Sequence, residues 1–349
     1  MRESVKTTSG QATDLSQQLN RDEVVANVRR LSGTPADRGL DDDHIVAGVT
    51  GFTEQLEYWY VRVMREAVPN YRRLVVARIN PFVRRVEFDG MAAAGVAGRL
   101  VDDYDARNFV TAGGWAIERM AVEASPTGHK SSASGIDIER HDAGTGITHL
   151  YVVKSGTVTR NSDILKALKR NAREAEGRLL QGRGKGKGVV AVRANYAIAA
   201  GQTTTSWRDG IARPSSGEFW AEVLGLSEND AIETALAMAA EAGRIVKRDA
   251  SSHVGAMKVL VEDYVSKPGS PGEVDWEFIS RRNMRTAAVW QAEDLDRHKH
   301  ALAALRATGY ALGRTAEKAP ATGPITETEV AAAEAAARLL LAGDQEEAP

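Results

Sequence analysis

An acid and a lysine in two neighbouring segments of β-type sequence are the residues of this chain that could do chemistry. Asp137 lies within residues 135–139 (GIDIE), and Lys154 lies within residues 151–156 (YVVKSG). Hydrolysis of a phosphodiester needs a carboxylate-held divalent cation, which polarises the phosphate and generates hydroxide, and a second cation that offsets charge in the transition state. Asp137 would supply the first requirement and Lys154 the second.

A β-hairpin is the element that would bring these two side chains together. Both segments are apolar and β-branched and alternate with period 2, and residues 142–146 (DAGTG) between them have turn chemistry. Aspartate is depleted in strands, so Asp137 between two isoleucines favours a functional role over a structural one. Lys154 would share the face of Val152, and a lysine in such apolar company favours a functional role too.

The sequence leaves two interpretations for the other acidic and basic residues near the predicted hairpin: a role in the site, or exposure on the surface. Glu139 would share the face of Asp137 because side chains repeat every two residues, but it lies near the turn and could be a solvated acid. Glu118 and Glu123, on a predicted helix, could be surface acids. Lys130, with His129 in the loop before the first strand, could contact phosphate or be merely exposed. The remaining histidines have no spacing that predicts a metal site.

A strongly basic stretch follows the hairpin. Between Thr159 and Arg193 there are ten Lys or Arg residues against three Asp or Glu, in a chain whose net charge is -2. Such clustering favours contact with nucleic-acid phosphates. The predicted DNA-binding residues are Lys130, Arg160, Lys166, Lys169, Arg170, Arg173, Lys185 and Lys187. The alternatives are a solvated helix face and, for residues 182–188 (GRGKGKG), a flexible connector, since this run leaves a helix and enters a strand, unlike a phosphate-binding P-loop.

Length and composition set the broad class. With 349 residues, 43% hydrophobic and 26% charged, the chain can form one large domain with helical additions, or two domains. The absence of cysteine excludes a disulfide framework, thiol catalysis and cysteine-ligated zinc, and suits a reducing cytoplasm. No apolar run approaches about 18 residues and the N-terminus lacks an apolar core segment, so we expect a cytoplasmic protein without membrane insertion.

The order of predicted elements is that of an α/β protein. Periodicity and capping signals predict helices at 22–31, 42–68, 91–103, 115–124, 162–181, 216–224, 227–247, 252–265 and 276–307. Two further strands are predicted after the hairpin, at 189–198 and 203–211. We divide the chain into a flexible N-terminal segment (1–40), a helical region (41–110), an α/β core (111–225), a C-terminal helical region (226–312) and a mobile Ala-rich tail (313–349) with a possible helix at 326–341.

Several motifs together resemble one enzyme family. Residues 130–139 (KSSASGIDIE) followed by 153–156 (VKSG) resemble the core of type II restriction endonucleases of the PD-(D/E)XK superfamily, in particular its PmeII-like branch. Segments 80–82 (NPF), 113–118 (GGWAIE) and 218–220 (EFW) match that branch as well, so the similarity spans roughly residues 80 to 225. One departure is Val152, where the superfamily has its second carboxylate.

The resemblance implies a PD-(D/E)XK restriction-endonuclease-like core, a mixed sheet flanked by helices, with helical N- and C-terminal additions. It implies a homodimer that cuts both strands of double-stranded DNA at a specific, palindromic site, with a DNA methyltransferase as genetic partner and a role in phage defence. Mg²⁺, for which Mn²⁺ substitutes, would be held by Asp137, the backbone carbonyl of Val153 and Glu118, with Glu139 as the other candidate acid. Lys154 would orient water and stabilise charge.

Two other functions stay open at this point. A structure-specific or repair nuclease could use the same fold, because a fold alone does not fix the substrate. A non-catalytic DNA-binding protein, inactive because position 152 lacks a carboxylate, belongs to a different class. Discrete bands, smeared cutting or binding without cutting would distinguish the three.

Overall fold

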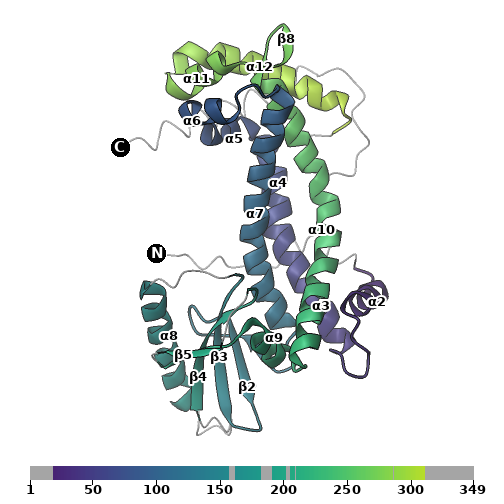
Figure 1. Cartoon of the computed structure of the whole chain (residues 1–349), viewed down its shortest axis with the longest axis vertical. Coiled ribbons are helices and arrows are strands. Elements are labelled where there is room, and N and C mark those ends of the chain that lie inside the picture. Colours follow the sequence, from purple (N-terminus) through teal and green to yellow (C-terminus); the bar gives the residue numbers. More distant parts are fainter. Residues whose placement is uncertain are drawn as a thin grey trace. The chain divides into compact units, whose positions relative to one another are not determined.

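The computed structural model of the protein describes residues 19–156, 162–181, 191–201, 205–208, 210–285 and 287–310. The chain forms two compact units, each assembled from segments that are not contiguous in the sequence. The first contains the residues up to Val61 and Asn108–Arg248, and the second contains Arg62–Arg107 and the residues from Asp249 onward. Two long helices, α7 (Ala93–Glu123) and α10 (Glu228–Val265), contribute residues to both units (Figure 1).

A mixed six-stranded sheet forms the centre of the first unit. Its strands are β1 (Gly128–Lys130), β2 (Ile138–Asp142), β3 (Ile147–Lys154), β4 (Ala191–Ile198), β5 (Ser206–Arg208) and β6 (Ile211–Arg213). The order is β1-β2-β3-β4-β6-β5; β4 runs parallel to β3 and β6, and the other neighbours are antiparallel. The predicted α/β class with a mixed sheet and the predicted hairpin, formed by β2 and β3, are confirmed.

One face of the sheet is covered by the helix that connects its two central strands. Helix α8 (Ser162–Gln181) lies between β3 and β4 in sequence, as a parallel connection requires. Its Leu168 packs in one apolar cluster with Leu150 and Val152 of β3. The amphipathic pattern of α8 therefore buries its apolar stripe on the sheet.

The opposite face carries a second helix. Helix α9 (Ser216–Leu224) begins with a capping box between Ser215 and Glu218, which fixes its start where the sequence predicts it. Its Phe219 contacts Tyr151 of β3 at a ring-centroid separation of 5.8 Å. Because side chains alternate along a strand, Tyr151 points away from the α8 side, so β3 is covered on both faces.

The predicted fourth strand, residues 203–211, is wrong in its extent. Strand β5 ends at Arg208 and β6 begins at Ile211, so the segment forms a short antiparallel hairpin. Gly210 between them has φ +77, a left-handed conformation that favours glycine and reverses the chain. A turn at this glycine ends the strand earlier than the apolar pattern indicates.

An N-terminal helix also belongs to the first unit. Helix α2 (Arg21–Ser32), capped by the Asn20 side chain, confirms the helix predicted at 22–31 and buries Val24 and Val28. The segment assigned to a flexible N-terminus thus contains a packed helix. Residues 1–18 lie outside the described residues.

The helix predicted at 42–68 contains a local change of helix type. It comprises α3 (Asp42–Leu56), a π-helical turn η1 (Glu57–Val61) and α4 (Arg62–Ala67). Gly48 allows α3 to pack closely, because a Cβ there would lie 2.8 Å from the Cβ of Ala124. The extra residue of a π turn shifts which side chains face outward, and such turns occur frequently at functional sites.

One helix, α7, replaces the two helices predicted at 91–103 and 115–124. It continues through Gly113 and Gly114, each of which costs about 1 kcal/mol of helix propensity relative to alanine. A Cβ at Gly114 would lie 3.4 Å from the Ser155 hydroxyl oxygen, so the helix packs closely against the end of β3. Packing of this kind outweighs propensity.

The C-terminal helices also differ from the prediction. Helix α10 is continuous where two helices were predicted, at 227–247 and 252–265, because residues 248–251 contain no proline or glycine. The segment 276–307 forms two helices, α11 (Trp276–Met284) and α12 (Ala287–Ala307), where one was predicted.

The break between α11 and α12 has a local cause. Arg285 has extended backbone, with φ -120 and ψ 161, and its carbonyl accepts a hydrogen bond from the Trp290 ring N–H at 3.0 Å. The Arg282 guanidinium stacks over the same ring, 3.6 Å from its centroid. Burial of this tryptophan therefore favours a turn over a continuous helix.

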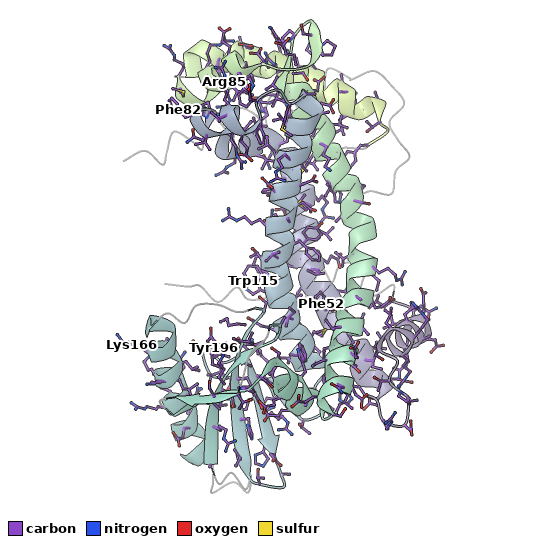
Figure 2. All side chains as sticks on the ribbon, in the orientation of Figure 1. Phe52, Phe82, Arg85, Trp115, Lys166 and Tyr196 are labelled. Atoms are coloured by element: carbon purple, nitrogen blue, oxygen red, sulfur yellow. The ribbon has the colours of Figure 1, made fainter. Side chains whose placement is uncertain are left out.

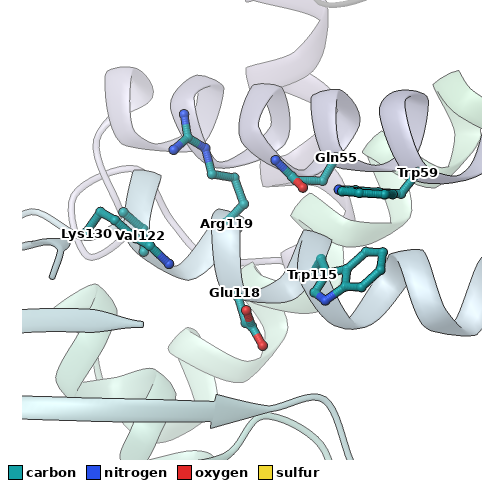
Figure 3. Close-up of a pocket in the computed structure, with 7 residues that line it drawn as sticks. All are labelled: Gln55, Trp59, Trp115, Glu118, Arg119, Val122 and Lys130. Atoms are coloured by element: carbon teal, nitrogen blue, oxygen red, sulfur yellow. The ribbon is translucent and has the colours of Figure 1, made fainter. Parts of the chain in front are cut away.

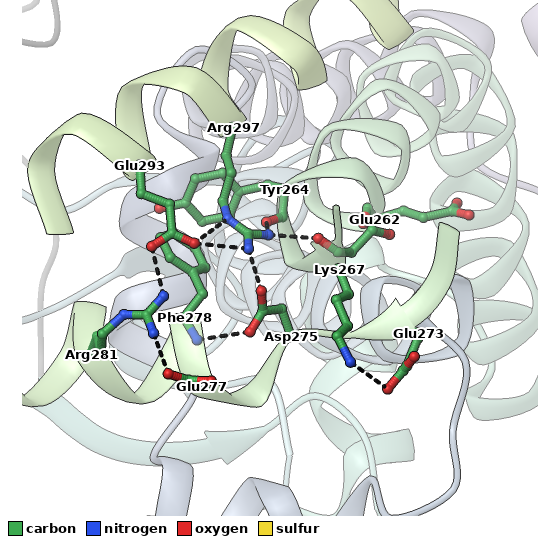
Figure 4. A network of polar contacts seen from close by, with 11 residues as sticks. Glu262, Tyr264, Lys267, Glu273, Asp275, Glu277, Phe278, Arg281, Glu293 and Arg297 are labelled. Atoms are coloured by element: carbon green, nitrogen blue, oxygen red, sulfur yellow. Dashed lines mark hydrogen bonds and ion pairs between the residues drawn. The ribbon is translucent and has the colours of Figure 1, made fainter. Parts of the chain in front are cut away.

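The second unit is mainly helical and holds a buried network of charges. Besides α4, α11 and α12 it contains α5 (Tyr71–Arg78), α6 (Pro81–Glu87), β7 (Ser266–Lys267) and β8 (Ser270–Val274). Arg297, whose side chain is 6% exposed, pairs with Asp275 and with Glu293 and lies over the Phe278 ring (Figure 4). These contacts hold the β7–β8 hairpin region to α11 and α12.

In the described ranges, no helix combines the length and the apolar character needed to cross a membrane. The possible helix at 326–341 and the predicted tail lie outside the described residues.

Candidate active site

Asp137 lies directly before β2, which begins at Ile138. The predicted strand at 135–139, which would have contained Asp137, is therefore wrong in its bounds. Gly135, with φ +71, turns the chain two residues before Asp137. The Asp137 N–H donates to the Tyr151 carbonyl at 2.8 Å, and its Oδ2 accepts a hydrogen bond from the Val153 N–H at 2.8 Å. The carboxylate is therefore fixed against the backbone of β3.

Lys154 is the last residue of β3. It directly follows Val153, whose N–H donates to the Asp137 carboxylate, so the acid and the lysine lie at the same end of the hairpin. The ladder between β2 and β3 begins with Ile138 opposite Tyr151 and does not include Asp137. A shared face for Asp137 and Lys154 therefore stays a prediction.

Glu118 approaches this pair from helix α7. Its carboxylate interacts electrostatically with Asp137, Lys154 and Lys130. Burial is the main cause, and the negative charge of Asp137 the second, of a rise in the pKa of Glu118 from its ordinary value of 4.5 to about 7; the two lysines offset part of this rise. Four predicted site residues are thus brought together.

Asp137 and Glu118, the acid pair of the site, fit a divalent cation. Burial and mutual repulsion disfavour two ionised carboxylates, and a cation beside them removes both penalties. Asp137 Oδ1 lies 4.0 Å from the Lys130 ammonium, so one positive charge is already near. Mg²⁺ commonly takes one or two carboxylates and completes its shell with water and substrate phosphate. In the described part of the chain no three acidic or histidine side chains form a metal-binding cluster.

Position 152 cannot contribute a carboxylate. Val152 is 7% exposed and belongs to the apolar cluster beneath α8. Glu139, the other candidate acid, accepts a hydrogen bond from the Ser131 hydroxyl at 3.3 Å and lies 3.8 Å from the His129 ring nitrogen. These contacts tie Glu139 to the β1 side of the hairpin, which favours Glu118 as the partner of Asp137.

The basic residues predicted to bind DNA are only partly described. On α8, Lys166, Arg170 and Arg173 are exposed and Lys169 is half-buried. Figure 2 marks Lys166 on this helix, whose apolar side faces the sheet. Arg160, Lys185 and Lys187 lie outside the described residues. Lys130, with 60% of its side chain exposed, lies at the acid pair itself.

A pocket of about 310 Å³ adjoins the acid pair (Figure 3). Its lining consists of Gln55, Trp59, Trp115, Glu118, Arg119, Val122 and Lys130. Glu118 extends from α7 toward the strands, while Trp59 and Trp115 lie beside each other. Sequence reasoning missed Gln55, Trp59, Arg119 and Val122, whose meeting depends on tertiary packing. Trp115 directly follows Gly113 and Gly114 in the segment that resembles the restriction endonuclease family. This position was the one sequence signal that pointed to Trp115 as a site residue.

Comparison with known proteins adds an independent observation. The family model described as "Type II restriction endonuclease EcoO109I" matches residues 58–242, and no curated protein matches the chain. The matched segment includes Glu118, Asp137 and Lys154 together with the whole six-stranded sheet. Because the match covers more than half of the 349 residues, the chain belongs to the type II restriction endonuclease EcoO109I family.

Proposed function

We propose that the protein is a Mg²⁺-dependent enzyme that hydrolyses both strands of double-stranded DNA at a specific short site. The observation that carries this proposal is the convergence of Asp137, Glu118 and Lys154 at the end of the β2–β3 hairpin. A carboxylate pair with an adjacent ammonium group has the charges that phosphodiester hydrolysis requires. Membership of a restriction endonuclease family supports DNA as the substrate.

The side chains divide the work by charge. Asp137, Glu118 and the backbone carbonyl of Val153 would hold the cation, and Mn²⁺ would substitute for Mg²⁺. When bound, the cation polarises the scissile phosphate and activates a water molecule. The Lys154 ammonium donates hydrogen bonds to the phosphate and offsets its developing negative charge. The exposed Lys130 holds a phosphate in register beside it.

The basic face of α8 would position the DNA backbone. The helix is pinned to the sheet by its apolar side, so its exposed Lys166, Arg170 and Arg173 are held in fixed relation to the active site. Contacts from such side chains fix register without reading bases. We include Arg160, Lys169, Lys185 and Lys187 in the same proposed role.

The proposed superfamily, dimeric state, location and genetic partner follow from the likeness of the sequence to the PmeII-like branch. Segment 80–82 begins helix α6, 113–118 lies in α7 and 218–220 lies in α9. These segments support a PmeII-like restriction endonuclease with a PD-(D/E)XK core. A homodimer suits the task because each subunit of a two-fold dimer cuts one strand of a palindromic site. A cytoplasmic location and a DNA methyltransferase that protects the host genome complete this proposal.

A second candidate rests on one observation. Val152 replaces a carboxylate and is packed in the core, so the protein could bind DNA without cutting it. The two candidates differ in a direct assay. DNA of known sequence is incubated with the protein and Mg²⁺, and with a chelator as control, and the ends of the products are sequenced.

Discrete fragments that share one end sequence would support the proposed restriction endonuclease. Retention of DNA without cleavage, with either Mg²⁺ or Mn²⁺, would support the non-catalytic candidate. Smeared or junction-selective products would instead indicate a structure-specific or repair nuclease.

A further inference from the structure

Two tryptophans of the first unit are exposed side by side. Trp59 is 39% exposed and Trp115 is 41% exposed, whereas Trp220 and Trp290 are each 5% exposed. The rings of the exposed pair are 4.6 Å apart between centroids and inclined at 53° (Figure 3). Contiguous exposed apolar surface marks candidate binding sites, whereas singly scattered apolar residues are normal.

The fold holds the pair in this position. Trp59 lies in the π-helical turn η1, and its neighbour Tyr60 is 3% exposed and packs edge-on against Phe109 at 5.2 Å. Anchoring of Tyr60 in the core turns Trp59 outward. On α7, Trp115 follows Gly114, which packs against the end of β3. Both rings are thus mounted on rigid elements, as a preorganised binding surface requires.

The pocket beside the rings is continuous with the acid pair. Glu118 and Lys130 line the pocket and also belong to the candidate active site. Its volume, about 310 Å³, lies at the lower end of the range for ligand pockets, which suits one planar heterocycle. The Gln55 amide in the lining offers both a donor and an acceptor, the groups with which a base edge is read.

We propose that Trp59 and Trp115 bind one nucleobase of the DNA, turned out of the duplex stack, next to the phosphate that is cut. This inference rests on the proposed function, because the phosphate is placed by Lys154 and the acid pair. Aromatic rings stack on any base, and Lys130 in the pocket lining would contact the phosphate that belongs to the same strand. The pair thereby positions the strand for cleavage.

The first test measures DNA affinity in a protein that does not cut. Full-length Lys154→Ala protein is compared with the same protein carrying Trp59→Leu or Trp115→Leu, using fluorescence anisotropy of a labelled duplex that contains the cleavage site. Loss of one stacking ring is expected to raise Kd roughly 5- to 100-fold. Trp115→Phe, which retains an aromatic face, should stay within roughly threefold of the parent.

Leu236→Ala is the control. Leu236 lies on α10 in the first unit, is 61% exposed and does not line the pocket, whereas Tyr58 packs edge-on against Trp59 and is unsuitable. Its replacement should leave Kd and the cleavage rate of the otherwise unchanged enzyme within about twofold, a limit set by the small effect of most surface substitutions. Circular dichroism of every variant checks that the fold is intact.

The second test removes the base instead of the ring. Duplexes with a single abasic position are scanned across the nucleotides that flank the cut. At one position, removal of the base should weaken DNA binding by the Lys154→Ala protein that keeps both tryptophans. The same removal should not weaken binding further in the protein that also carries Trp115→Leu, because groups that interact give non-additive effects. The loss of affinity in the protein that keeps both tryptophans is measured without any aromatic substitution, so the absence of such a loss at every scanned position would contradict the proposal even if a leucine variant misfolds.

The outcomes separate the two proposals. Cleavage by the wild-type enzyme, with unchanged Kd in both leucine variants and additive abasic effects, would overturn the base-binding pocket and leave the nuclease proposal standing. Failure of the wild-type enzyme to cut any DNA would overturn the proposed function. In that case a Kd that depends on Trp59 and Trp115 would still support a nucleobase site on a DNA-binding protein.

Discussion

The Asp137 carboxylate accepts a hydrogen bond from the backbone N–H of Val153 at 2.8 Å, which couples the acid directly to the residue before Lys154. This contact holds the Asp137 carboxylate against the backbone of β3, one residue before Lys154. The hairpin is therefore the positioning element of the proposed active site, to which Glu118 would be added from α7.

Replacing either charged residue of the hairpin should abolish cleavage. Asp137→Asn retains an acceptor for the Val153 N–H but removes the charge, and Lys154→Ala removes the ammonium group. Each loss is expected to reduce the single-turnover cleavage rate by roughly a hundredfold or more. DNA binding, measured by anisotropy, should largely remain.

Asp142→Asn provides the control within the same hairpin. The Asp142 side chain accepts hydrogen bonds from Gly144 and Thr145 in the turn, and an asparagine can replace most of them. Its cleavage rate should equal that of the parent. Near-parental cleavage by Asp137→Asn would reject the assignment of this acid.

The dependence of cleavage on Mg²⁺ should identify the second acid. We expect Glu118→Gln to need much more Mg²⁺ or to lose activity, because Glu118 shares its electrostatic environment with Asp137 and Lys154. Glu139→Gln should be milder, since Glu139 contacts Ser131 and His129. The measurement is the cleavage rate over a Mg²⁺ titration for each variant.

Glu123→Gln, on the same helix, is the control for this titration. Glu123 pairs with Arg119 at 2.8 Å near the surface, a contact that contributes little to stability. An unchanged Mg²⁺ requirement in Glu118→Gln would refute our choice, and unchanged requirements in both glutamate variants would mean that water and backbone complete the site.

The raised pKa of Glu118 predicts a pH dependence of stability. Between 4.5 and about 7 the folded protein keeps a proton that the unfolded chain has released, so wild-type stability falls as pH rises through this window. Glu118→Gln lacks this loss. In a chelating buffer the variant should therefore be the more stable protein above pH 7, and the difference should shrink toward pH 4.5.

Urea unfolding at several pH values measures this difference directly. Added Mg²⁺ should stabilise the wild type by binding to the folded state and should have a smaller effect on Glu118→Gln. A pH-independent difference between the two proteins would argue against the raised pKa.

Local sequence patterns predict the hairpin because neighbouring residues determine its strands and its turn. Alternating apolar residues and the turn at 142–146 determine β2 and β3, and Asp137 and Lys154 then lie at the same end of this hairpin. Capping chemistry at Ser215 likewise predicts the start of α9. These features need no knowledge of distant parts of the chain.

Other features depend on tertiary contacts that one segment cannot reveal. Helix α7 continues through Gly113 and Gly114 despite the low helix propensity of glycine, and local sequence does not reveal this continuity. The exposure of Trp59 depends on a π turn that periodicity treats as ordinary helix. The electrostatic environment of Glu118, close to Asp137 and Lys154, depends on the packing of α7 beside the hairpin.

The left-handed turn before Asp137 should be sensitive to a side chain. Gly135 has φ +71, and a Cβ there would lie 2.5 Å from the Asn171 amide nitrogen. Gly135→Ala should destabilise the protein by about 1–2 kcal/mol for the left-handed backbone, since the Asn171 side chain can move aside. It should also slow cleavage by displacing Asp137.

Gly177→Ala supplies a control of opposite sign. Gly177 lies inside α8, and a Cβ added there would meet nothing within 4 Å, so alanine should stabilise the helix by roughly 0.5–1 kcal/mol. Urea unfolding measures both variants. Equal stability of Gly135→Ala and the parent would contradict the proposed strain.

The buried charge network of the second unit should be essential for its stability. Asp294, with 3% of its side chain exposed, pairs with Arg72 at 2.5 Å and with Arg282 at 3.1 Å and accepts a hydrogen bond from the Tyr264 hydroxyl. Asp294→Asn would leave two guanidinium groups without their counter-charge, and breaking a buried pair in this way costs about 3–5 kcal/mol. Asp296→Asn, two residues along α12 and 73% exposed, should change stability by less than about 0.5 kcal/mol. Thermal and urea unfolding of the pair tests this, and equal losses in both variants would show that the network does not stabilise the unit.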